Sequence, residues 1–319
     1  MESASNCLYC QSKNHEKWIQ FQDLFNEHYQ LHKCNDCGLY FLSPQPTEEQ
    51  FRRAYEESYY GEGDKKFNPL VEKVVDWFRA KNSKRFAQRI PKNAKVLDIG
   101  CGNGSFLVNL GKHCSAHLHG LELPGKSAER AAQREQIKLH IGELKSDTYE
   151  EKYFDAIVLT HVFEHLPHPQ ETLEIIRKIA RSNCVLQIEI PNIDSWQARL
   201  FKGNWLHLDP PRHLHFFTPK QLKAELLKHG FECIGERYFS PQFSPFGAQQ
   251  SILNGMLPKR EILYEHLKGN HKYTTEYSSF HLLCQQVFHW LSFPFFLLTD
   301  FIASSCSKGA TVKLIFRKQ

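Results

Sequence analysis

Residues 94–104, AKVLDIGCGNG, carry the pattern with the clearest chemical meaning. A short apolar run leads to one acid, Asp98, and three glycines follow at alternate positions: Gly100, Gly102 and Gly104. This order predicts a buried strand, a tight turn and then a helix. Glycine suits such a turn because it accepts positive φ and lets a ligand lie against bare backbone.

The acid narrows the choice of ligand. A nicotinamide dinucleotide places its pyrophosphate at the helix N-terminus, where the carboxylate of Asp98 would repel it. S-adenosylmethionine (SAM) has no phosphate and carries an ammonium group and a sulfonium, so an acid at the end of the strand suits it. The pattern therefore predicts a SAM site.

Further segments follow in the order that repeated β–α units require. Residues 116–123 indicate a second strand that ends in Glu122, an acid placed to accept two ribose hydroxyls. Residues 138–144 indicate a third strand with Glu143 at its tip. A fourth strand at 153–169 runs into a helix. The remaining elements are expected as strands at 184–191, 231–239 and 310–318 and a helix at 219–229.

The glycine pattern and the segment YFDAIVLTHVFEHLPHP (153–169) resemble motif I and the fourth-strand segment of class I SAM-dependent methyltransferases. The resemblance implies an α/β fold, with a seven-stranded Rossmann-like sheet, helices on both faces and a last strand running antiparallel between the fifth and sixth. It also implies that Glu143 lies near the adenine amino group. The predicted cofactor-binding residues are Asp98, Gly100, Cys101, Gly102, Gly104, Glu122, Leu123, Glu143, Leu144, Thr160 and His161.

Two C-x2-C pairs, Cys7 with Cys10 and Cys34 with Cys37, precede this region. Each pair can present two thiolates from one turn, and two turns complete the tetrahedral shell of Zn2+. Since cysteine fills all four positions, no place remains for a catalytic water, and the metal would serve folding. A redox site is disfavoured because the pairs do not follow a thioredoxin-like βαβ pattern.

The cysteine pairs, CGLYFLSPQP (37–46) and YEESYYG (55–61) together resemble a broad family of bacterial zinc-ribbon-bearing SAM methyltransferases. Many members are encoded with glycan, lipid or secondary-metabolite genes, and the core also resembles ubiquinone-pathway O-methyltransferases. Thr47 opens a capping box, and Tyr59 and Tyr60 are candidates for a lid over SAM. The expected regions are a zinc-ribbon-like module (1–45), a helical linker or lid (46–92), a SAM-binding core (93–239 and 310–319) and a helical insertion (240–309), for which a substrate cap is one alternative.

That insertion contains the most apolar stretch of the chain, LLCQQVFHWLSFPFFLLTDFIASS (282–305). Three alternatives stay open: a cap over the substrate pocket, a face dipping into a membrane, and helices packed on the sheet edge. A membrane span is disfavoured, because His289, Pro294 and Asp300 interrupt a run that is shorter than the ~20 residues required.

Methyl transfer is an in-line displacement, so the protein mainly positions the acceptor and excludes water. A hydroxyl acceptor also needs a proton acceptor, and histidine suits that task near pH 7. His213 is the first candidate base, followed by His215 and His165. His213 and His215 lie in DPPRHLHFFT (209–218), an element similar to one that precedes the last helix in related enzymes. The alternative is that these imidazoles hydrogen-bond loop backbone.

Two polar groupings near these histidines have more than one interpretation. His161, Glu164 and His165 have helical spacing and are expected to share one face. In ubiquinone-pathway enzymes a similar E-x-x-E-H segment is associated with a divalent metal. His161 replaces the first glutamate here, which disfavours that metal. Arg212 would either bind an acceptor carboxylate or phosphate, or pair with Asp209.

Composition limits the choice of partners. The 319-residue chain has a net charge of +5 with acidic and basic residues mixed, and no basic run predicts a nucleic-acid groove. The start, MESASNCLYC, lacks signal-peptide character, and ten cysteines are then expected as thiols or metal ligands. The cytoplasm is the expected compartment, with peripheral membrane contact through 282–305 as an addition. The oligomeric state is left open.

The predicted function is SAM-dependent methylation of a small-molecule acceptor, at a hydroxyl oxygen of a glycan, lipid-linked or secondary-metabolite intermediate. One alternative is N- or C-methylation, including C-methylation of a nucleotide sugar. Another is a protein that binds SAM or a partner without catalysis. The presence of both Asp98 and Glu122 disfavours this last alternative.

Overall fold

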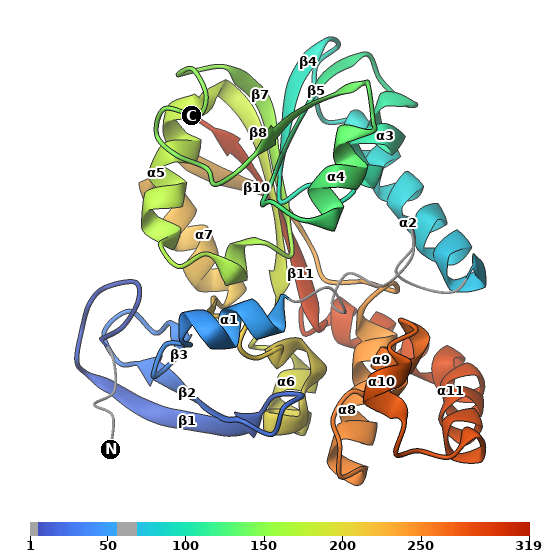
Figure 1. Cartoon of the computed structure of the whole chain (residues 1–319). Coiled ribbons are helices and arrows are strands. Elements are labelled where there is room, and N and C mark those ends of the chain that lie inside the picture. Colours follow the sequence, from blue (N-terminus) through green and yellow to red (C-terminus); the bar gives the residue numbers. More distant parts are fainter. Residues whose placement is uncertain (1–5, 56–68) are drawn as a thin grey trace. The chain divides into compact units, whose positions relative to one another are not determined.

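The computed structural model describes residues 6–55 and 69–319, which form two compact units (Figure 1). The ribbon unit consists of Met1–Pro69, Pro191–Gln221 and Arg237–Val312. The seven-stranded unit consists of Leu70–Ile190, Leu222–Glu236 and Lys313–Gln319. The candidate lid residues Tyr59 and Tyr60 lie outside the described residues.

The seven-stranded unit is built on a sheet of order β10-β11-β8-β7-β4-β5-β6. The pairs β4–β5, β4–β7, β5–β6 and β7–β8 are parallel. The last strand of the chain lies between the fifth and sixth strands of this sheet, as predicted. The strands are β4 Ala94–Ile99, β5 Ala116–Glu122, β6 Ile137–Ile141, β7 Phe154–Thr160, β8 Ala180–Pro191, β10 Phe231–Arg237 and β11 Thr311–Lys318.

Helices cover this sheet on both faces, α5 and α7 on one and α2, α3 and α4 on the other (Figure 1). Double coverage explains why β4 and β7 are nearly continuous apolar runs, since a parallel sheet buries both of its faces. The helices are α2 Pro69–Ala87, α3 Ser105–Gly111, α4 Lys126–Ala132, α5 Pro169–Ile179 and α7 Pro219–Lys228.

Two local predictions in this unit need correction. The fourth strand does not run directly into an α-helix: a short 3-10 helix, η2 Phe163–His165, intervenes before α5. Pro169 occupies the first turn of α5, and the preceding residues leave the helical conformation. The third strand ends at Ile141, so Glu143 follows it in a loop.

The ribbon unit contains a four-stranded sheet of order β1-β2-β3-β9. The first three strands are β1 His15–Gln22, β2 His28–Cys34 and β3 Tyr40–Leu42. The fourth, β9 His215–Phe216, comes from far along the chain and pairs antiparallel with β3. Residues 191–221, which the sequence grouped with the SAM-binding core, therefore pack with the N-terminal strands.

The other regular elements described in the ribbon unit are helices, and the insertion is mainly helical. The predicted capping box is confirmed at α1 Glu48–Ala54, where Thr47 and Gln50 cap each other. Trp205 and Phe216 are buried in the core of this unit, together with strand residues such as Phe21. The other helices are α6 Trp196–Phe201, η3 Lys202–Asn204, η4 Leu206–Leu208, α8 Ser244–Met256, α9 Ile262–Leu267, α10 His271–Thr274 and α11 Ser279–Ser305.

Candidate functional site

The glycine-rich turn has the backbone that the sequence predicted. Gly100, Gly102 and Gly104 have φ of +68°, +58° and +74°, and Gly104 opens α3. A Cβ at Gly100 would lie 2.4 Å from a methyl of Val162, and one at Gly104 would lie 2.6 Å from Ile137. A Cβ at Gly102 would meet nothing within 4 Å. The first and third glycines thus close the turn, and the second faces open space where a ligand can approach.

Two acids stand at the carboxyl ends of neighbouring strands beside this turn. Asp98 is buried near the end of β4, and Glu122 is the last residue of β5. Burial and the charge of Glu122 raise the pKa of Asp98 well above its ordinary value. Burial also raises the pKa of Glu122, although its carboxylate accepts hydrogen bonds from the amides of Gly102 (2.6 Å) and Leu123 (3.2 Å).

These two carboxylates fit a cationic ligand. Among the described residues, no lysine or arginine forms an ion pair with Asp98 or Glu122. A positively charged group between or beside them would relieve both their desolvation and their mutual repulsion. SAM carries such groups, whereas a pyrophosphate would add to the repulsion.

The raised pKa values predict that SAM binding is linked to pH. Because the free site favours protonated carboxyls and a bound cation favours carboxylates, binding is expected to release protons. SAM affinity should therefore fall as the pH is lowered through the pKa of Asp98 in the free protein. Calorimetric titration at one pH in two buffers of different ionisation enthalpy measures the protons released. Equal apparent enthalpies in both buffers would contradict the linkage.

The other predicted cofactor residues lie at the same edge of the sheet, after β4, β5, β6 and β7. Cys101 is buried, while Leu144 is half-buried. Leu123, Glu143 and Thr160 are exposed. The carboxyl edge of an open parallel sheet is the usual place for a ligand. Their individual roles remain predictions.

His161 adopts a left-handed conformation (φ +53°) directly after β7, so it does not belong to a helix as expected. Its Nδ1 nevertheless lies 3.2 Å from Oε1 of Glu164. Burial alone would lower the pKa of His161, but the hydrogen bond to Glu164 and the charges of Glu164 and Glu189 raise it. His165 is half-buried at the end of the 3-10 helix.

The sequence did not predict the ion pair near the end of β8. Glu189 is buried, and its carboxylate lies 3.0 Å from Nζ of Lys313 on β11. The backbone carbonyl of Glu189 also accepts the amide of His161 (2.9 Å). A single acid inside the apolar run CVLQIEIP was the available signal for this pair.

In the ribbon unit, Arg212 pairs with Asp209, which decides between its two predicted roles. Its Nε donates to Oδ2 of Asp209 (3.0 Å), and a second nitrogen donates to the other carboxylate oxygen. Nη1 donates to the carbonyl of Ala54 (2.9 Å). These bonds hold the guanidinium within its own unit and leave little donor capacity for an acceptor anion.

His213, the first candidate base, is held by two neighbours in the same unit. Its Nδ1 lies 2.8 Å from the carbonyl of His207, and its Nε2 lies 3.6 Å from Oδ2 of Asp209. Since a carbonyl only accepts, Nδ1 carries a proton and donates it to His207. His215 is fully buried in β9, edge-on to Phe217.

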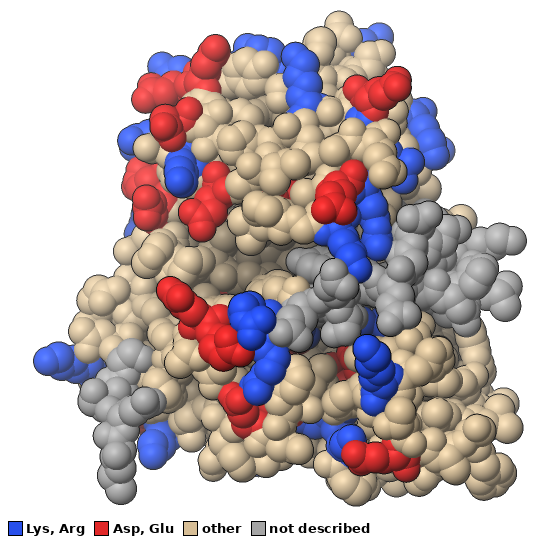
Figure 2. Space-filling model, in the orientation of Figure 1, with Lys and Arg blue, Asp and Glu red and all other residues tan. Residues whose placement is uncertain are grey.

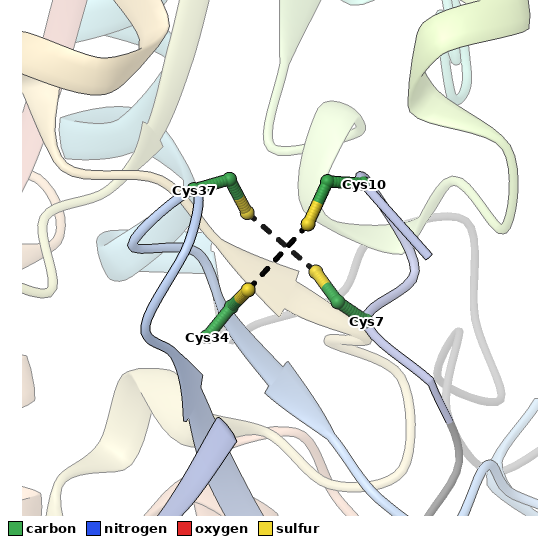
Figure 3. A group of neighbouring side chains, drawn as sticks. All are labelled: Cys7, Cys10, Cys34 and Cys37. Carbon is green, nitrogen blue, oxygen red and sulfur yellow. Dashed lines mark hydrogen bonds between the residues drawn. The ribbon is translucent and has the colours of Figure 1, made fainter. Parts of the chain in front are cut away.

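The four cysteines of the two C-x2-C pairs converge in space (Figure 3). The Sγ atoms of Cys7 and Cys37 lie 3.6 Å apart, those of Cys10 and Cys34 lie 3.5 Å apart, and all four lie within 4.8 Å of one another. Four Zn–S bonds of about 2.3 Å in a tetrahedron place the sulfurs roughly 3.8 Å apart. A disulfide would need about 2.05 Å. The arrangement fits a zinc ion.

The turn after the second cysteine pair closes at Gly38. Its φ is +76°, and its amide donates to the carbonyl of Cys34 (2.9 Å). A Cβ at Gly38 would lie 2.3 Å from Nε2 of Gln221. Only glycine therefore closes this turn without moving a neighbour.

Comparison with known proteins identifies the catalytic fold. The family pattern described as a methyltransferase domain matches residues 76–236, about half of the chain. The chain belongs to this methyltransferase family. Asp98 and Glu122, at the glycine-rich turn, lie within the matched residues.

Two curated relatives of this methyltransferase have different acceptors in their names. EEF1A lysine methyltransferase 2 of Danio rerio is 27% identical over 173 residues, which cover 52% of this chain and 64% of the relative. Malonyl-[acyl-carrier protein] O-methyltransferase of Paenibacillus sp. (strain JDR-2) is 28% identical over 200 residues, with 52% and 71% covered. The match to the first relative thus spans less than two thirds of its length.

Solved structures support the fold of the methyltransferase. A protein of Galdieria sulphuraria, described provisionally as a sarcosine dimethylglycine methyltransferase, superimposes with a TM-score of 0.50 at 13% identity. The alignment covers 84% of this chain and 97% of that one. At this identity the likeness concerns architecture alone.

Proposed function

We propose that this methyltransferase transfers the methyl group to a hydroxyl oxygen of a small molecule. The acceptor class that fits the chain's resemblances is a glycan, lipid-linked or secondary-metabolite intermediate. The observation that carries the choice of oxygen is the setting of His213, whose Nδ1–H donates to the backbone carbonyl of His207 and whose Nε2 lies beside the carboxylate of Asp209.

SAM, when bound, supplies a methyl group on its sulfonium. Nε2 of His213 would accept the proton that the acceptor hydroxyl loses when its oxygen takes the methyl group. Asp209, 3.6 Å from that nitrogen, stabilises the resulting imidazolium. His165 and His215 are the further candidates; the complete burial of His215 in β9 ranks it behind His213.

In the same proposal, the acids of the seven-stranded unit hold the cofactor. Asp98 balances its positive charge, Glu122 accepts the ribose hydroxyls and Glu143 lies near the adenine. The glycines of the turn, with Cys101, let the backbone approach. The remaining contacts of the proposed cofactor site come from Leu123, Leu144, Thr160 and His161.

The surface charges favour a small-molecule acceptor over nucleic acid. Lysine and arginine are interspersed with aspartate and glutamate on the face that Figure 2 shows, without an extended area of one sign. Nucleic-acid binding draws on clustered positive charge. We place the reaction in the cytoplasm, in agreement with ten cysteines that form no disulfide.

We further propose that Cys7, Cys10, Cys34 and Cys37 bind one structural zinc ion. The sulfur spacing supports this site, and four thiolate ligands leave no coordination position for a substrate or water. The metal would therefore stabilise the ribbon and take no part in methyl transfer.

Replacing His213 with glutamine is expected to lower kcat about a hundredfold or more, because a general base typically contributes that much. SAM affinity should stay unchanged, since the replacement lies outside the glycine-rich turn. The measurement is turnover of labelled SAM on panels of hydroxyl and amine acceptors, followed by kcat and SAM affinity of the variant.

His113→Gln, at an exposed histidine, is the control and should match the parent protein. Thermal unfolding of both variants separates lost chemistry from lost structure. Turnover on amines alone would overturn the oxygen acceptor, and full activity of His213→Gln on a hydroxyl acceptor would remove His213 as the base.

A further inference from the structure

Helix α11 has an inverted distribution of side chains for a helix on a protein surface. Between Leu283 and Ile302 every exposed residue is apolar. The polar side chains of the same stretch, glutamines, His289, serine, threonine and Asp300, are all buried or half-buried. The exposed residues are Leu283, Cys284, Val287, Trp290, Leu291, Pro294, Phe295, Leu298, Phe301 and Ile302.

Two buried polar residues of α11, His289 and Asp300, form hydrogen bonds within their own unit. Nδ1 of His289 lies 2.8 Å from Oε1 of Gln249 on α8, whose Nε2 donates to the carbonyl of His289 (2.8 Å) and to Ser292 (2.7 Å). Oδ2 of Asp300 accepts the amide of Ser240 (3.2 Å). These contacts fix the rotation of α11, so its apolar side cannot turn inward.

The exposed apolar area on the outward side of α11 is larger than the largest apolar patch of a typical monomer. Nine large apolar side chains on α11 are about half to three-quarters exposed. Together they present on the order of 1,000 Å2, whereas the largest apolar patch of a typical monomer is about 300–600 Å2. The margin of Figure 2 that corresponds to α11, at the lower right, carries neither blue nor red.

The length and the apolar character of this side of α11 favour contact with the hydrocarbon of a lipid bilayer. The exposed side chains from Leu283 to Ile302 carry no charge and extend over about 30 Å at 1.5 Å per residue. Protein interfaces of that size normally carry a polar rim. The helix meets the length and hydropathy of a membrane span, with a mean hydropathy of 1.4 and 17% of the window buried. α8 packs along its other side, so lipid cannot surround α11 while the unit stays folded.

We propose that the outward side of α11 docks the protein on a lipid bilayer, with the helix lying in the plane of the membrane and its exposed apolar side chains in the acyl region. Because that side has no charged residue, the attraction is hydrophobic and does not require anionic headgroups. This docking does not rest on the oxygen acceptor or on His213.

The test is flotation of the purified protein with phosphatidylcholine vesicles, at low and at high salt. We expect the protein to float with the vesicles at both salt concentrations, and Leu291→Glu to reduce the bound fraction at least tenfold. Leu291 is 78% exposed, so the replacement should leave folding intact. Leu227→Glu on α7, at 61% exposure, is the matched control and should float like the parent.

Trp290 supplies a second measurement from the middle of the helix. Lipids with brominated acyl chains should quench part of the tryptophan fluorescence, and Trp290→Phe should remove that part.

Light scattering tests the alternative occupant of this side of α11, a second copy of the chain. A dimer that Leu291→Glu makes monomeric, without flotation of the parent, would assign this side of α11 to a second copy. Absence of flotation by a monomeric parent would also overturn the proposal.

Discussion

Serine in place of Cys34 is expected to unfold the ribbon and to release its zinc. Cys34 is fully buried at the end of β2, and its amide is bonded to Leu39 in the turn that closes the second cysteine pair. A structural zinc ion contributes about 10–16 kcal/mol to the folding of small zinc modules. That matches or exceeds the roughly 5–15 kcal/mol by which a whole domain is stable.

The loss should extend beyond the first 42 residues, because β9 completes the same sheet from residues 215–216. Metal analysis should find one zinc per chain in the parent and none in Cys34→Ser, and thermal unfolding should show the lost transition. A chelator should have the same effect on the parent.

Cys306→Ser is the matched control, since Cys306 is exposed and lies outside the cluster. This variant should keep both its zinc and its unfolding temperature. A parent protein that purifies without zinc, yet unfolds at the same temperature as Cys34→Ser, would rule out a structural metal.

Asparagine in place of Asp98 is expected to weaken SAM binding at least thirtyfold, because a charge-assisted contact contributes about 2 kcal/mol or more. The same replacement should not destabilise the free protein. Burial and the charge of Glu122 raise the pKa of Asp98 in the folded state. Because the pKa of Asp98 is lower in the unfolded chain, ionisation of this carboxyl lowers the free energy of unfolding as the pH rises through the raised pKa. Asparagine removes this cost while keeping the shape of the side chain.

The two effects of Asp98→Asn therefore have opposite signs, which a misfolded variant would not show. Calorimetric titration with SAM measures the first. Thermal unfolding without SAM measures the second, and the gain in unfolding temperature should grow with pH. Asp155→Asn, in an acid at the amino end of β7, is the control and should keep its SAM affinity. Unchanged affinity of Asp98→Asn would remove the acid from the cofactor site.

Local patterns were enough to predict the core of the seven-stranded unit. The run before Asp98 and the glycines after it specify strand, turn and helix within eleven residues, because backbone freedom and burial act over that range. The two cysteine pairs predicted their cluster for a similar reason, since C-x2-C holds two sulfurs close within one turn. The capping box at Thr47 is equally local.

Contacts with segments distant in the sequence determine the partners of Arg212, His215 and His161, which local patterns did not decide. Whether Arg212 binds a ligand or Asp209 depends on the carbonyl of Ala54, which completes its hydrogen bonds from far along the chain. His215 became part of the ribbon because β3 had an edge to pair, which no pattern near His215 records. The left-handed turn at His161 likewise follows from its bond to the carbonyl of Glu189 on the neighbouring strand.

The amino-acid sequence by itself determined the glycine-rich turn, its two acids and the cluster of four cysteines, because each rests on residue types at short spacing. Only the tertiary structure decided which way α11 faces. Its composition allows burial, a cap or a membrane contact equally. The hydrogen bonds of His289 and Asp300 to α8 and to residue 240 select one rotation of the helix, and that rotation turns its apolar side outward.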